Sequence, residues 1–189
     1  MIRRWIIKIF DPDRDISERI FRLVSTFGII AIIVMFFFGL VIGENIQALI
    51  MLIIALLLLL VITYFSLAYN RIDIGAGIIA FFILLVLLPV AFLTSGGMYG
   101  GTPAWFVFCA VYICISVRGR MTAVCLAIET VVAVICYYIA WAFPDKIVGH
   151  TANAAYMDSL SGVVIVSFMV CLLIFFQRLL YKQENDKAR

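Results

Sequence analysis

Six long runs of apolar residues, separated by short polar connections, constrain the fold of this chain more than any other feature. A helix needs about 20 apolar residues to cross the roughly 30 Å hydrocarbon core of a bilayer. Because free backbone groups find no water in lipid, such runs form hydrogen-bonded helices and not open strands. The sequence therefore predicts an all-α integral membrane protein, a bundle of six transmembrane helices at residues 20–43, 46–69, 74–94, 103–117, 121–143 and 160–181.

The fourth run is shorter than the others. If Pro103 stands at the first helical position, where its missing N–H costs nothing, the helix has only about 15 residues. It then covers roughly 22 Å, so the bilayer must thin around it or the preceding loop must dip into the membrane.

Composition indicates lipid, rather than water, as the solvent. Of the 189 residues, 66% are hydrophobic, whereas a soluble domain keeps nearer to half. In water, a fold of this composition would expose very large apolar patches. The net charge of +3 is small and the basic residues are dispersed, so we expect the lipid bilayer, and not nucleic acid, as the partner.

The distribution of Lys and Arg predicts the orientation. With an even number of spans, both chain ends and alternate loops share one side, and all of the 14 lysine and arginine residues except Lys146 fall there. Cytoplasmic loops carry such an excess of positive charge. We therefore expect the N- and C-termini in the cytoplasm.

The first residues predict a different kind of helix. Ile2, Trp5 and Ile6 share one face with further apolar residues while Arg3 and Lys8 lie on the other, a pattern typical of helices in the headgroup plane. Asp15, with Glu18 three residues later, predicts a cap for the next helix. The expected organisation is a cytoplasmic interfacial helix and turn at 1–16, the six-helix domain at 17–182, and the start of a cytoplasmic linker at 183–189.

Sequence motifs of catalysis or metal binding are not apparent. The 5 cysteines lie in apolar runs without Cys-x-x-Cys spacing, and His150 is the only histidine. The sequence therefore does not offer the ligands of a zinc or haem site or the residues of a Ser-His-Asp triad. We expect no metal, no cofactor and no enzymatic activity in this chain itself.

Glu129 is the one acidic residue deep within an apolar run. An ionisable group near the bilayer midplane is a functional-site hypothesis by default, and a carboxyl there is expected to carry its proton and to donate to a neighbouring helix. Two interpretations stay open, a helix-to-helix hydrogen bond and a ligand-sensing role. Tyr112 and Ser167, at similar depth, are the candidate partners.

The glycine-rich stretch at residues 95–103 is the most unusual segment. Its glycines free the backbone for tight turns, and Tyr99, Trp105 and Phe106 offer amphipathic aromatic surfaces at headgroup depth. Either a lid over a cavity or a tight loop with an ordinary aromatic belt fits this pattern. Tyr99, Trp105, Phe106, Glu129 and Tyr112 are accordingly the candidate ligand-binding residues.

Three segments of the chain resemble a known kind of domain. They are the entry Phe10-Asp11-Pro12-Asp13, the stretch from Pro89 through Ser-Gly-Gly to Gly-Gly-Thr-Pro-Ala-Trp-Phe, and the exit Phe175-Phe176-Gln177. Together they resemble the six-helix membrane-associated sensor domains of bacterial histidine kinases and diguanylate cyclases, over essentially the whole chain.

The resemblance implies a stimulus-receiving domain in the bacterial inner membrane, usually in a homodimer, whose last helix runs on into a cytoplasmic output module. This chain departs from the pattern because it carries no kinase or cyclase motif. The apolar character of the spans favours a small hydrophobic or membrane-borne ligand, such as a lipid, an aromatic metabolite or an amphipathic peptide. A small transporter or channel is the main alternative, although it would be expected to carry more polar residues within the spans.

Overall fold

The computed structural model describes residues 11, 15–149 and 151–188, and these form a bundle of helices without a strand. The interfacial helix predicted for the first ten residues lies outside the described part. The helices in chain order are α2 (Ile16–Ile42), α3 (Ile46–Ala68), α4 (Ile72–Phe82), the π-helical turn η1 (Ile83–Leu87), α5 (Leu88–Thr94), the short η2 (Gly97–Tyr99), α6 (Thr102–Ser116), α7 (Arg120–Ala142), the short η3 (Pro144–Lys146) and α8 (Ala152–Ala188).

Five helical segments of the described residues are long and apolar enough to cross a membrane: α2, α3, the continuous stretch Ile72–Thr94, α7 and α8. This is the pattern of a multi-pass membrane protein and confirms the all-helical membrane class. The remaining apolar run, the fourth along the chain, forms α6. Its 15 residues fall short of spanning length, as the sequence predicts.

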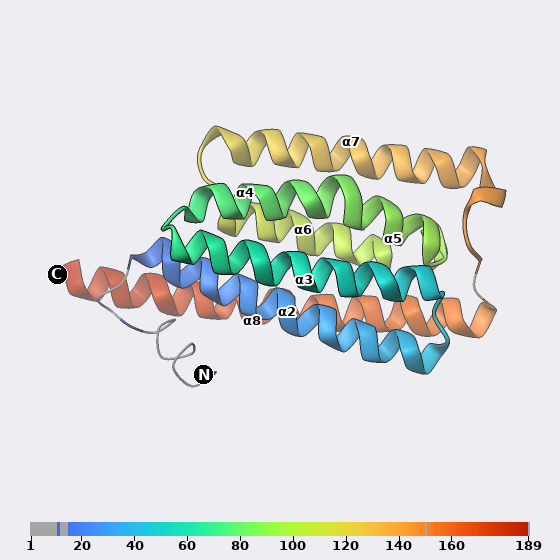
Figure 1. Cartoon of the computed structure of the whole chain (residues 1–189), viewed down its shortest axis with the longest axis horizontal. Coiled ribbons are helices and arrows are strands. Elements are labelled where there is room, and N and C mark those ends of the chain that lie inside the picture. The colour runs from blue at the N-terminus through green and yellow to red at the C-terminus, as the bar shows by residue number, and fades with distance from the viewer. Residues whose placement is uncertain (1–10, 12–14, 150, 189) are drawn as a thin grey trace.

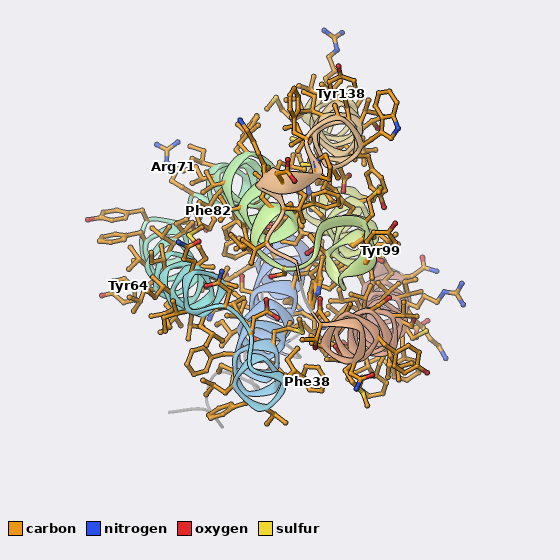
Figure 2. All side chains as sticks on the ribbon, turned by 90° about the vertical axis from the view of Figure 1, so that its right-hand side faces the viewer. Phe38, Tyr64, Arg71, Phe82, Tyr99 and Tyr138 are labelled. Atoms are coloured by element: carbon orange, nitrogen blue, oxygen red, sulfur yellow. The ribbon has the colours of Figure 1, made fainter. Side chains whose placement is uncertain are left out.

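The helices run up and down the bundle in three layers (Figure 1). In Figures 1 and 2, α7 forms one outer layer, the α4–α5 stretch and α6 form the middle, and α3, α2 and α8 form the other side. The start of α2, the α3–α4 and α6–α7 connections and the end of α8 lie at one end, which we call the basic end because it carries Arg71, Arg118 and Arg120. The α2–α3, α5–α6 and α7–α8 connections lie at the opposite end, the glycine-loop end.

Local sequence accounts for where the helices begin and end. Asp15 caps α2 by accepting from the backbone N–H of Ser17 at 3.0 Å, as predicted. Glu18, one turn into the helix, accepts from the guanidinium of Arg22 at 2.7 and 2.9 Å. Gly43 ends α2 in the left-handed conformation at φ 72°, which a residue without Cβ adopts at no steric cost.

The helix from residue 72 to 94 contains one wide turn, η1, just before Pro89. Proline has no N–H to donate and its ring clashes with the carbonyl four residues earlier. A π turn widens the helix there, and the N–H of Leu88 donates to the carbonyl of Ile83, five residues back. The helix therefore continues through Pro89 instead of ending.

The first part of α2 forms the centre of the bundle. All residues from 19 to 25 are buried, among them Arg19, Arg22 and Ser25. Farther along, Ile30, Phe37 and Val41 lie exposed on the outside of α2, where lipid is the expected neighbour. The buried side of this second part faces a cavity.

Candidate functional site

A cavity of about 150 Å³ lies between α2, α3, the α4–α5 stretch and α6. Its wall is almost wholly apolar and includes Phe38, Ala55, Leu59 and Leu87. Along α2 the lining extends from Val24 to Ile42, which at 1.5 Å per residue is about 27 Å. The cavity is thus long and narrow.

Small residues in the sequence create this space. Gly28, Ala31 and Gly39 of α2 face Ala48 and Ala55 of α3 across the cavity, each set at a spacing that keeps it on one helix face. The helices still touch between these gaps, because a Cβ on Gly28 would lie 3.2 Å from Leu59 and one on Gly39 would lie 3.0 Å from Leu49. Gly39 therefore packs against α3, and Gly43 ends α2.

The polar groups of the cavity gather mainly at the glycine-loop end. Glu44, Ser95, Thr102 and Asp158 line it there, beside Trp105. Asp158 is only 4% exposed, and its Oδ2 accepts from the backbone N–H of Gly101 at 2.6 Å. The carboxyl group of Asp158 therefore lies at one end of the apolar cavity.

Asp158 reaches the cavity because α8 begins before the predicted apolar span. The sequence predicts an apolar span from residue 160 to 181, and the helix that contains this span begins eight residues before it, at Ala152. In the second turn of this helix, Asp158 packs against the glycine-rich loop through its hydrogen bond from Gly101. A Cβ on Gly162 would lie 2.9 Å from both Cα and the carbonyl oxygen of Gly101, so the two backbones are in direct contact.

The glycine-rich loop is tied down on several sides. The N–H of Gly96 donates to the carbonyl of Val148 at 3.1 Å, and the N–H of Val148 donates to Leu93 at 2.9 Å. A Cβ on Gly100 would lie 1.9 Å from the carbonyl oxygen of Ser95. The loop is thus compact and bonded to its neighbours, and it covers the end of the cavity through Ser95 and Thr102.

The structure separates the aromatic residues that the sequence singled out. Trp105 and Tyr112 line the cavity, and the hydroxyl of Tyr112 donates to the carbonyl of Ala76 at 3.3 Å. Phe106 is buried on another side of α6, with its ring 6.4 Å from that of Phe92. Tyr99 is 75% exposed and points away from the bundle (Figure 2). Only two of the four aromatic candidates therefore share the cavity.

Glu129 lies outside the cavity, between α7 and α6. It is 6% exposed, and its carboxyl lies beside the backbone of Ala110 and close to Cys109. Its Oε1 has no hydrogen-bond partner among the described residues. Neither candidate partner fits, because Tyr112 donates to Ala76 and Ser167 is on the exposed side of α8.

A second polar contact joins α2 to α8 at the basic end. The guanidinium of Arg19, fully buried, donates to Oε1 of Gln183 at 2.5 Å and lies 3.7 Å from Oε2 of Glu184. This contact holds the polar end of α8, which extends past the other helices (Figure 1). Sequence reasoning missed Arg19 and Asp158. The only signal was that each is a charged residue at the edge of an apolar run, which also describes many solvated residues.

The arrangement is that of an apolar cavity whose lining includes one residue of the long helix α8. Among the described residues, no group of three or more His, Cys, Asp or Glu is placed to hold a metal ion. The cavity has one polar end, and the helix that contributes Asp158 there also contacts Arg19 at the other end of the bundle. Compared with models of protein families, with curated proteins and with solved structures, the chain shows no significant match.

Proposed function

We propose that this chain is the sensory domain of a bacterial membrane receptor, which binds a small hydrophobic or membrane-borne ligand in the cavity and passes the signal through α8 to a cytoplasmic output module. One observation carries the proposal. Helix α8 supplies Asp158 to the cavity. At its other end it extends beyond the bundle, where Gln183 accepts a hydrogen bond from Arg19. The output module is a histidine kinase or a diguanylate cyclase, as the resemblance of the sequence implies.

In this proposal the chain crosses the inner membrane six times, with α6 as the short span and with the basic end in the cytoplasm. The up-and-down path and the arginines Arg71, Arg118 and Arg120 at one end support this orientation. A reporter enzyme fused after Arg189 tests it: cytoplasmic activity is expected, and activity on the outer side of the membrane contradicts it.

The signalling step is a shift between two packings of the bundle. A ligand in the cavity contacts α2, α3 and α6 and lies against the loop that docks on α8. Because Gly101 and Gly162 are in backbone contact, a movement of the loop displaces α8 directly. In a homodimer, the two α8 helices would pass this displacement to paired output modules.

A cavity-filling substitution tests the proposal without knowledge of the natural ligand. Ala55 is 2% exposed and lines the cavity, so Ala55→Phe places a ring where the ligand would bind. The matched control is Ala127→Phe on the exposed side of α7. Each variant is fused through α8, in helical register, to a histidine kinase whose autophosphorylation is measured in membranes.

We expect Ala55→Phe to change autophosphorylation at least about fivefold, the low end of typical coupling between sites, and Ala127→Phe to leave it unchanged. Equal activity of both variants and the unsubstituted fusion contradicts the sensory proposal. A solute flux into liposomes that Ala55→Phe blocks would instead favour the transporter alternative.

A further inference from the structure

We propose that Glu129 binds and releases a proton, and that α7 packs closely on α6 only while the carboxyl of Glu129 carries that proton. The inference goes beyond the proposed function and does not depend on it, because Glu129 does not line the cavity. It assigns a ligand, the proton, to the one acidic residue deep within an apolar run.

The position of Glu129 makes a negative charge there costly. The residue is 6% exposed and lies in α7, one of the helices long and apolar enough to cross a membrane. It follows Arg120, the first residue of α7, by nine positions, or about 14 Å along the helix axis. A carboxylate so far inside an apolar layer loses its hydration, whereas the neutral, protonated group loses much less. The bound proton therefore allows Glu129 to be buried.

The elements around Glu129 do not supply a basic side chain to balance its charge. Those that pack against α7 are α4, η1, α5, η2, α6 and η3. Within these described elements, the one Lys or Arg is Lys146 of η3. Its ammonium group lies at the glycine-loop end, 5.6 Å from the ring centre of Phe143. Arg120 of α7 is exposed at the basic end. An ionised Glu129 is therefore without a counter-ion from these elements.

The titratable groups nearest to Glu129 are neutral ones. Cys109 of α6 lies close to its carboxyl, and Cys125 lies one turn before it on the same face of α7. Tyr112, one turn along α6 from Cys109, donates its hydroxyl to the carbonyl of Ala76. Thiols and phenols are uncharged near neutral pH, so Glu129 is the group in this contact whose charge changes with a proton.

The other titratable residues of these elements lie farther away or face elsewhere. Helix α5 and the turn η1 contain none, and α4 contributes Asp73 in its first turn, at the basic end. The short helices η2 and η3 carry theirs at the glycine-loop end. These residues are Tyr99, Asp145 and Lys146. Cys114 of α6 is exposed.

Helix α7 is attached to the bundle through a narrow strip. Among the residues of α7, those that are buried are Cys125, Glu129, Cys136 and Ala140, and three of the four have small side chains. Figures 1 and 2 show α7 as an outer layer of the bundle. The strip buries little apolar area, and Oε1 of Glu129 has no hydrogen-bond partner among the described residues. The charge of this one carboxyl is therefore enough to decide whether the strip stays closed.

Loss of the proton requires water at Glu129. Ionised residues within a membrane protein are tolerated where they pair or where water reaches them. Because the strip is narrow, the least costly route for water is a turn or tilt of α7 away from α6. The buried thiol of Cys125, one turn before Glu129, becomes accessible in the same movement.

The cysteines of the chain report this movement. Cys125 is buried in the strip, whereas Cys114 is exposed on α6 and serves as the internal reference. The full chain in nanodiscs is treated with a small uncharged maleimide over a series of pH values, and mass spectrometry gives the labelling of Cys125 relative to Cys114. The matched variants are Glu129→Gln, which keeps the shape but cannot ionise, and Glu129→Asp, which keeps a carboxyl.

In the unsubstituted chain, we expect the relative labelling of Cys125 to rise with pH by up to about tenfold per pH unit, because each unit lowers the proton concentration tenfold. Thiols also react faster as they ionise, and Glu129→Gln measures that contribution alone. The rise in the unsubstituted chain should exceed the rise in Glu129→Gln several-fold, and Glu129→Asp should retain the larger rise.

The proposal is overturned by an equal pH dependence in the unsubstituted chain and in Glu129→Gln, because thiol ionisation then accounts for the whole rise. It is also overturned if Cys125 stays unlabelled at every pH, or if Cys125 reacts as fast as Cys114 at the most acidic pH. None of these results bears on the cavity, which Ala55→Phe tests separately.

Discussion

Alanine substitution at two helical glycines provides a test of how α8 docks on the glycine-rich loop. Gly162 of α8 is in backbone contact with Gly101, and a Cβ there would lie 2.9 Å from two backbone atoms. Gly77 of α4 has nothing within 4 Å of its Cβ position. Both positions gain about 1 kcal/mol of helix propensity from alanine, so the difference between the variants isolates the contact with the loop.

Backbone atoms cannot turn aside as a side chain can, so Gly162→Ala must push the loop and α8 apart. Overpacking of this kind costs about 1–3 kcal/mol. For a chain of this size, 1 kcal/mol corresponds to about 2–4 °C in Tm. We therefore expect Gly162→Ala to melt about 2–12 °C below Gly77→Ala.

The assay is thermal unfolding in nanodiscs, followed by tryptophan fluorescence and by helical circular dichroism. Gly77→Ala itself should melt at or above the unsubstituted chain. Equal melting temperatures for the two variants would refute the direct contact between Gly162 and Gly101. So would a higher melting temperature for Gly162→Ala.

Three further predictions concern buried polar groups and helix orientation. Arg19→Met removes the contact with the end of α8, so amide hydrogen exchange in the last turns of α8 should speed up by roughly tenfold. The control Arg71→Met, in an exposed connection, should leave the exchange rate unchanged. Equal exchange rates in the two variants argue against the contact. Glu129→Met removes a buried oxygen without a hydrogen-bond partner in the described structure and should raise the Tm by about 2–8 °C, and a fall in Tm would contradict this. A lipid-soluble maleimide should label Cys114, which is exposed on the bundle, and leave Cys125, which is buried, unmodified. Mass spectrometry measures the labelling, and the reverse pattern would contradict the packing of α6 and α7.

Apolar periodicity and helix punctuation were enough to predict most of the fold. Each predicted run corresponds to a helix, the short fourth run is α6, and Asp15 caps α2. These features are local, because run length, caps and turn glycines each depend on a few neighbouring residues. The start of α8 was not predicted, because hydropathy locates an apolar run and says nothing about helix that continues beyond it, as residues 152–159 do before the run at 160–181.

The candidate site was harder to predict because it depends on which helix faces which. Trp105 and Tyr112 line the cavity, whereas Glu129, the most conspicuous residue in the sequence, lies on the far side of α6. Depth along a helix follows from counting residues, but the direction of a side chain around the bundle axis follows from tertiary packing. Asp158 and Arg19 acquire their roles from partners 57 and 164 positions away in the chain.

Because α8 is one continuous helix, it fixes the rotation, about the helix axis, of any domain attached to its end. Asp158 and Gln183 lie 25 residues apart on one helix of 37 residues, or about 37 Å, with no proline between them. One added residue beyond Gln183 turns whatever follows by about 100°, while seven return it to nearly its first direction. In chimeras that join α8 to an output domain, the response should therefore vary with the number of residues inserted at the junction, and it should recur every seven residues.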